Sequence, residues 1–116
     1  MAYVDGFLVP VPNDRKQDYR ALAERMAPLF REHGATRMVE GWGDDVPNGK
    51  LTDFPMAVKL EPGETVVFSW IEWPSKAVRD AGMAKVMADP RMQPGEDMVF
   101  DGQRMVFGGF EVLVEG

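Results

Sequence analysis

The sequence predicts an α+β fold in which an antiparallel sheet carries two helices on one face. Two observations predict it. Segments with the spacing of strands and of helices follow one another in the order strand, helix, strand, strand, helix, strand. The chain of 116 residues has the length of one domain and shows no linker and no internal repeat, so residues 1–116 are expected to form a single domain.

The first strand and the first helix are predicted near the N-terminus. Residues 2–11 are rich in valine and aromatic side chains and end at prolines, which is typical of a strand. Asp14 and Gln17 have the spacing of a capping box, and Gly34 is the predicted C-cap. Pro28 lies inside the predicted helix and indicates a bend. The apolar side chains that recur at helical spacing are Tyr19, Leu22, Ala23, Met26, Leu29 and Phe30.

A second strand is predicted over residues 35–43. Alternation along this strand places Met38, Glu40 and Trp42 on one face, which we expect to be buried. Residues 45–53 contain the run Val-Pro-Asn-Gly and are predicted to form a loop.

The third strand is the strongest strand prediction in the chain. It covers residues 65–73 and follows a turn at residues 61–64, with an additional short strand predicted over residues 56–60. Ser75 is the expected N-cap of the second helix, which Pro90 ends.

The C-terminal part is predicted to hold a long connection and the last strand. Gly82 is expected to let the second helix lie close to the sheet. Residues 91–103 are the connection, with one helical turn, and residues 104–114 are the strand. The pair Gly108 and Gly109 indicates a bulge in that strand.

This order of elements is the ferredoxin-like βαββαβ arrangement, in which two helices cover only one face of the sheet. The third and fourth strands are nevertheless apolar on both faces, whereas a strand with one wet face alternates apolar with polar residues. In the third strand, Val66, Phe68 and Trp70 lie on one side and Val67, Ile71 and Trp73 on the other. In the last strand, Val106, Phe110 and Val112 lie on one side and Met105, Phe107 and Leu113 on the other. A second copy of the chain is the simplest cover for the free face. We therefore predict a homodimer built as a dimeric α+β barrel.

Composition excludes several functional classes. A net charge of −6 argues against binding to nucleic acid or to an anionic membrane surface. The chain has no cysteine and one histidine, so it offers no disulfide, thiolate nucleophile or imidazole-based metal site, and we expect no resident cofactor or metal. The N-terminal residues lack the features of a signal peptide and no segment has the length of a membrane span, so we expect a cytoplasmic protein.

Five stretches resemble the YbaA-like family of small bacterial proteins. They are Tyr3–Phe7, Glu40–Pro47, Phe68–Pro74, Asp89–Met92 and Phe100–Phe110. The resemblance covers nearly the whole chain and implies the dimeric α+β barrel that the packing argument reached separately. The family is classed as a domain of unknown function, so the resemblance implies no reaction. Its wider structural neighbours include cofactor-free monooxygenases and isomerases of small aromatic molecules, which is an analogy of fold alone.

Glu40 and Asp44 are the candidate catalytic residues. Alternation turns the Glu40 carboxyl toward an apolar side of the second strand, where burial raises a carboxyl pKa and favours acid–base chemistry. The alternative for Glu40 is an ion pair with Arg104, the cation we expect nearest to it, or with Arg37, or else simple exposure near a strand end. Asp44 and its neighbours either form a site for a hard cation together with Asp53 or are turn residues that bond their own backbone, and we predict the latter.

The candidate ligand-binding residues are Trp42, Asp45, Lys50, Trp70, Arg79 and Arg104. The tryptophans are suited to line a pocket for an aromatic ligand, or else to form core and dimer interface. The arginines are suited to hold an anionic substrate.

Two functions remain open from the sequence. One is a small-molecule-binding protein or cofactor-free enzyme, with a pocket between the sheet, the helices and the loop at residues 44–52. We expect that loop to be ordered but mobile and to cover the mouth of the pocket. The other is a non-catalytic dimeric module that binds another protein or senses a metabolite. Converging side chains of Glu40, Trp42 and an arginine would favour the first, and a filled interior would favour the second.

Overall fold

The computed structural model describes residues 2–92 and 99–116, and its centre is one four-stranded sheet. The strands are β1 (Tyr3–Pro12), β2 (Arg37–Trp42), β3 (Glu64–Trp73) and β4 (Val106–Glu111). They lie in the order β2-β3-β1-β4, and every neighbouring pair is antiparallel. This is the ferredoxin-like α+β arrangement that the order of elements predicts.

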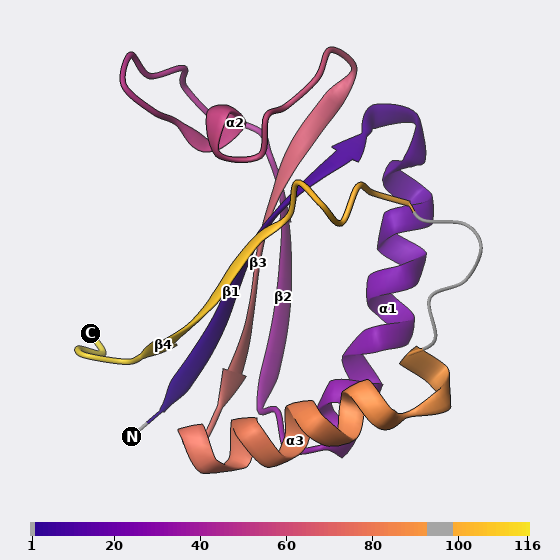
Figure 1. Cartoon of the computed structure of the whole chain (residues 1–116), viewed down its shortest axis with the longest axis vertical. Coiled ribbons are helices and arrows are strands. Elements are labelled where there is room, and N and C mark those ends of the chain that lie inside the picture. Colours follow the sequence, from indigo (N-terminus) through magenta and orange to yellow (C-terminus); the bar gives the residue numbers. More distant parts are fainter. Residues whose placement is uncertain (1, 93–98) are drawn as a thin grey trace.

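The two long helices lie on one side of this sheet (Figure 1). The helices are α1 (Lys16–Glu32), α2 (Phe54–Ala57) and α3 (Lys76–Ala88), with single 3₁₀ turns at Asn13–Arg15 and Pro90–Met92. Only the short α2 departs from that side. Two predicted caps are confirmed: the Ser75 hydroxyl accepts a hydrogen bond from the Val78 backbone N–H, and Gly34 follows α1 with φ at +111°.

The strand predicted over residues 56–60 is wrong, because α2 stands there instead. The Asp53 carboxylate caps α2 by accepting from the backbone N–H of Met56 at 2.6 Å, and Pro55 suits its first turn. The capping box predicted at Asp14 and Gln17 is also wrong, because a 3₁₀ turn precedes α1 and no side chain caps it.

The bulge predicted in β4 is wrong as well. Pairing with β1 runs without interruption through Gly6↔Gly108 and Asp5↔Gly109. Gly109 has a packing reason instead, because a Cβ there would meet the Tyr3 side chain and lie 2.8 Å from a guanidinium nitrogen of Arg79. The helical turn predicted for the connection coincides in part with Pro90–Met92, and its remainder lies outside the described residues.

The two faces of the sheet differ in what covers them. On the helix side, Val67, Ile71 and Trp73 are buried in two apolar clusters that include residues of α1 and α3. On the other side, called the open face below, Phe68 is 48% exposed and Phe110 is 62% exposed. Within one chain, the open face is therefore an uncovered apolar surface, as the predicted pattern implies.

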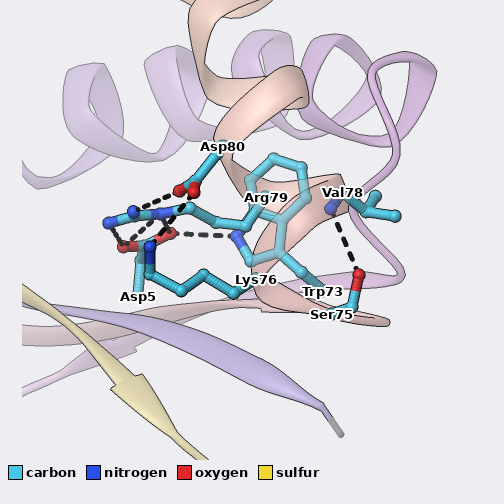
Figure 2. A network of polar contacts seen from close by, with 7 residues as sticks. All are labelled: Asp5, Trp73, Ser75, Lys76, Val78, Arg79 and Asp80. Carbon is cyan, nitrogen blue, oxygen red and sulfur yellow. Dashed lines mark hydrogen bonds and ion pairs between the residues drawn. The ribbon is translucent and has the colours of Figure 1, made fainter.

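A polar lock holds α3 to the sheet (Figure 2). The buried Asp5 carboxylate accepts from the Trp73 indole N–H at 2.9 Å and from the Arg79 guanidinium through contacts of 2.7–3.2 Å. Arg79 also pairs with Asp80 at 2.9 Å. Gly82 of α3 lies against Trp73, where a Cβ would sit 2.6 Å from the ring, so the close approach predicted for this glycine is confirmed. This region is filled and fully paired.

Candidate functional site

A cavity of about 430 Å³ lies between α1 and the sheet. One face of α1 forms its first wall, with residues recurring at helical spacing, and β2 and β3 form the second. Its lining includes Lys16, Tyr19 and Arg20 of α1, Glu40 and Trp42 of β2, and Val67 of β3. This volume falls within the usual range of small-molecule sites, about 300–1,000 Å³.

The centre of the cavity wall is a hydrogen-bonded carboxylate. The Tyr19 hydroxyl donates to Oε1 of Glu40 at 2.6 Å. Ser69 faces Glu40 across β2 and β3, and hydrogen bonding from its side chain lowers the pKa of the same carboxyl group. Tyr19 and Ser69 are 8% and 3% exposed, whereas Glu40 itself stays accessible because it borders the cavity. The carboxylate thus has a fixed position and a free approach.

The electrostatics of this group favour proton transfer. Protein atoms packed around the carboxyl raise the pKa of Glu40 above its ordinary value, and the hydrogen bonds from Tyr19 and Ser69 offset part of that rise. Burial, followed by the neighbouring Glu40 charge, raises the pKa of Tyr19, so the tyrosine keeps its proton and remains the donor. Within the described residues, no cation lies within ion-pair distance of Glu40.

Two cationic side chains, Lys16 and Arg20, form a rim that also borders the cavity. The Lys16 ammonium lies 5.2 Å from the centre of the Trp42 ring, an arrangement that holds both side chains. Arg20 is exposed and pairs with Glu24 at 2.9 Å. Trp42 thus presents its ring as part of the wall while Lys16 covers it from the rim.

The structure brings together only two of the residues singled out from the sequence, Glu40 and Trp42. Asp44, Asp45 and Lys50 are exposed in the loop after β2, and residues 44–52 contribute nothing to the cavity wall. The predicted mobility of the loop and the predicted role of these side chains in ligand binding or catalysis remain predictions. Asp53 is engaged as the cap of α2, and the described residues hold no group of three or more side chains suited to a metal ion.

The remaining candidates lie elsewhere. Trp70 belongs to the open face, where its indole N–H donates to Glu72 at 2.9 Å. Arg79 takes part in the lock on α3. Arg104 holds Glu64 with two contacts of 2.8 Å. Their role in ligand binding remains a prediction.

The interpretation of Glu40 as the ion-pair partner of an arginine is wrong. Arg104 pairs with Glu64 and Asp101, and Arg37 lies 3.7 Å from Glu72. Both arginines are therefore occupied away from the cavity.

Sequence reasoning missed Tyr19, Ser69 and Lys16 as members of the site. Tyr19 was assigned to the apolar stripe of the helix, which is correct for its ring but leaves the hydroxyl unassigned. Ser69 gave a usable signal, because it is the one polar residue among the inward positions from Val67 to Trp73 of β3. A buried polar side chain in such a row requires a partner.

Comparison with known proteins places the chain. It is 61% identical over 116 residues to the uncharacterized protein YbaA of Escherichia coli strain K12 and to that of Shigella flexneri. Each match covers 99% of this chain and 99% of the relative. A dimeric ferredoxin-like protein from an uncultured marine organism shares the fold at a TM-score of 0.61 and 11% identity over the full length of both chains. Rv0793 of Mycobacterium tuberculosis shares it at a TM-score of 0.53 and 16% identity, over 99% of this chain and 98% of the other.

Within the described residues, no helix is long and apolar enough to cross a membrane. The model of the family described as "Protein of unknown function (DUF1428)" matches residues 2–102. The chain therefore belongs to the DUF1428 family.

Proposed function

We propose that the protein binds a small molecule in the cavity beneath α1 and that Glu40 accepts a proton or a hydrogen bond from it. The observation that supports this most is the geometry of the carboxylate, which receives the Tyr19 hydroxyl at 2.6 Å yet borders an open cavity. A carboxylate held by hydroxyl donors rather than by a cation keeps its basicity. It can therefore accept the proton of a bound weak acid.

The walls indicate the body of the ligand. Trp42, Met38 and Val67 offer an aromatic ring and apolar surface on either side of Glu40. A planar, partly apolar molecule with one weakly acidic hydroxyl matches these walls. In the enzymatic form of the proposal, Glu40 acts as a general base without a cofactor and removes that proton during the reaction. In the binding form, the proton stays shared.

Calorimetric titration with phenol and with its methyl ether, anisole, tests the role of Glu40. The two probes share a ring, but only phenol donates a hydrogen bond. We expect phenol to bind about tenfold more tightly, since a hydrogen bond to a charged group contributes about 1.5 kcal/mol or more. Glu40→Gln should abolish that preference. Asp14→Asn, which alters an exposed carboxylate outside the cavity wall, is the control and should retain it.

Equal affinity of the wild type for both probes would contradict the proposal, as would a Glu40→Gln variant that still prefers phenol. Failure of phenol to bind at millimolar concentration would contradict it too. Absence of binding would favour the second function in its protein-binding form, a non-catalytic dimeric module that binds another protein.

We also propose that the protein is a homodimer in which the open faces of two copies pack together. Support comes from the exposure of Phe68, Val106 and Phe110 on that face and from the dimeric ferredoxin-like protein that shares the fold. The open faces of the two copies contact each other in an isologous arrangement. The same exposed aromatic side chains are therefore buried in both protomers. A dimer of this kind serves either function, because the cavity beneath α1 lies on the opposite side of the sheet.

Two phenylalanines of β4 give a matched test of the dimer. Phe110 is 62% exposed on the open face, and Phe107 is 69% exposed on the helix side, where it stacks on Phe7. We expect Phe110→Asp to convert a dimer into a monomer of 13.0 kDa in light scattering, because it places a charge in the interface. Phe107→Asp should remain dimeric. A wild type that is monomeric at micromolar concentration would refute this assembly.

A further inference from the structure

Two side chains of opposite charge border the cavity beneath α1, and within residues 2–92 and 99–116 neither has a counter-ion. Among the described residues, Glu40 is bonded only by hydroxyl groups, and Lys16 has the Trp42 ring as its partner but no carboxylate. The second cation on the rim, Arg20, is already paired with Glu24. A charge left without a counter-ion beside a cavity is available to a ligand.

These two charges lie at different points along the cavity. Tyr19 joins α1 to β2 at Glu40, and Lys16 joins them again at Trp42. The Cα atoms of residues two positions apart on one face of a strand, such as Glu40 and Trp42, are separated by about 7 Å. A six-membered ring with substituents at opposite positions has a comparable length. The Trp42 ring takes part in the second contact, so apolar surface lies next to the Lys16 ammonium.

We propose, on the basis of the proposed function, that the ligand is a small aromatic acid. Its hydroxyl contacts Glu40, and its carboxylate, at the opposite end of the ring, contacts Lys16. The remainder of the protein works against such an anion, because the chain carries a net charge of −6. Lys16 therefore supplies the positive charge that attracts the ligand carboxylate. The polarity of the site also orients the ligand, since reversal would place two carboxylates together.

The test compares three probes that share one ring: 4-hydroxybenzoate, 4-hydroxybenzamide and 3-hydroxybenzoate. We expect 4-hydroxybenzoate to bind about fivefold more tightly than the amide, since an exposed ion pair contributes up to about 1 kcal/mol. The preference should shrink when salt is raised toward 1 M, because salt screens exposed charges. The 3-hydroxy isomer should bind more weakly than the 4-hydroxy isomer, because its two groups are too close together.

Lys16→Met should remove the preference for the carboxylate while leaving the affinity for the amide unchanged. Lys85→Met is the matched control, because Lys85 is an exposed lysine of α3 outside the cavity wall, and it should behave as the wild type. If 4-hydroxybenzamide binds through Glu40 but 4-hydroxybenzoate shows no advantage, or if Lys16→Met keeps that advantage, this inference is overturned and the proposed function stands. If no probe responds to Glu40→Gln, the proposed function fails with it.

Discussion

Two carboxylates on the helix side of one sheet have opposite surroundings. Asp5 of β1 is 3% exposed and is enclosed by the Trp73 indole N–H and the Arg79 guanidinium, in the lock that holds α3 (Figure 2). Glu40 of β2 is accessible next to a cavity beneath α1, and in the part of the chain that the structure describes only hydroxyl groups bond it. The Asp5 carboxylate is neutralised by a guanidinium in a packed interior, whereas the Glu40 carboxylate has no such counter-charge among the described residues and borders a cavity.

This difference separates structure from function within a single layer of the fold. An ion pair with a buried partner contributes to stability only when it is complete, and neither partner is left to bind anything else. A carboxylate with hydroxyl partners remains a base, because hydroxyl groups fix its position without supplying a counter-charge. We therefore assign Asp5 to the scaffold and Glu40 to the site. The predictions below test that assignment.

The largest effect is expected for Arg79→Met. The change keeps much of the side-chain volume but leaves the Asp5 carboxylate buried without a cation. Breaking a buried pair in this way costs about 3–5 kcal/mol of unfolding free energy. Urea denaturation measures the loss. A variant as stable as the wild type would show that Trp73 alone satisfies Asp5 and that the ion pair is dispensable.

The next effect concerns the close approach of α3 to the sheet. A Cβ on Gly82 would collide with the His33 carbonyl oxygen and come within 2.6 Å of the Trp73 ring. We expect Gly82→Ala to lower the unfolding free energy by about 1–3 kcal/mol, despite the higher helix propensity of alanine. Ala23→Gly, in the wall of the open cavity, should lose no more than about 1 kcal/mol from propensity alone. A reversed order of these two losses would mean that the α3 region is the looser one.

A smaller effect is expected for Tyr19→Phe, which removes the hydroxyl that Glu40 accepts. The loss of one hydrogen bond is expected to cost about 1 kcal/mol. The Tyr19 hydrogen bond lowers the pKa of Glu40, so its removal should raise that pKa further. Carboxyl chemical shifts followed by NMR during a pH titration report the change. Tyr3→Phe is the control, and a shift of equal size there would remove the special role of Tyr19.

The smallest effect is a dependence of stability on pH. The carboxyl of Glu40 has an ordinary pKa of 4.5 and a raised one in the folded protein, so the folded state binds this proton more tightly. The contribution of Glu40 to stability therefore falls as pH rises from 4.5 through the raised value. Glu40→Gln lacks this titration and should gain stability relative to the wild type across that window. A relative loss over the same window would mean that the folded protein stabilises the charged form.

Sequence reasoning reached the fold more completely than the site. Strand alternation in β3 and the cap residues Ser75 and Gly34 were read correctly, because these features depend on neighbours in the chain. Glu40 and Trp42 were placed on the correct face of β2 for the same reason. The cavity was not predictable, because it depends on how far Lys16 and Tyr19 of α1 stand from the sheet. The partners of the arginines likewise depend on residues 40 and 74 positions away.

Denaturation of Asp5→Asn and Glu40→Gln, measured side by side in urea at neutral pH, tests the central claim most directly. Each change replaces a carboxylate with an amide of nearly the same shape. We expect Asp5→Asn to lose at least about 2 kcal/mol more than Glu40→Gln, which should remain within about 1 kcal/mol of the wild type. Equal losses, or a larger loss for Glu40→Gln, would show that Glu40 belongs to the scaffold and would contradict its assignment to a binding site.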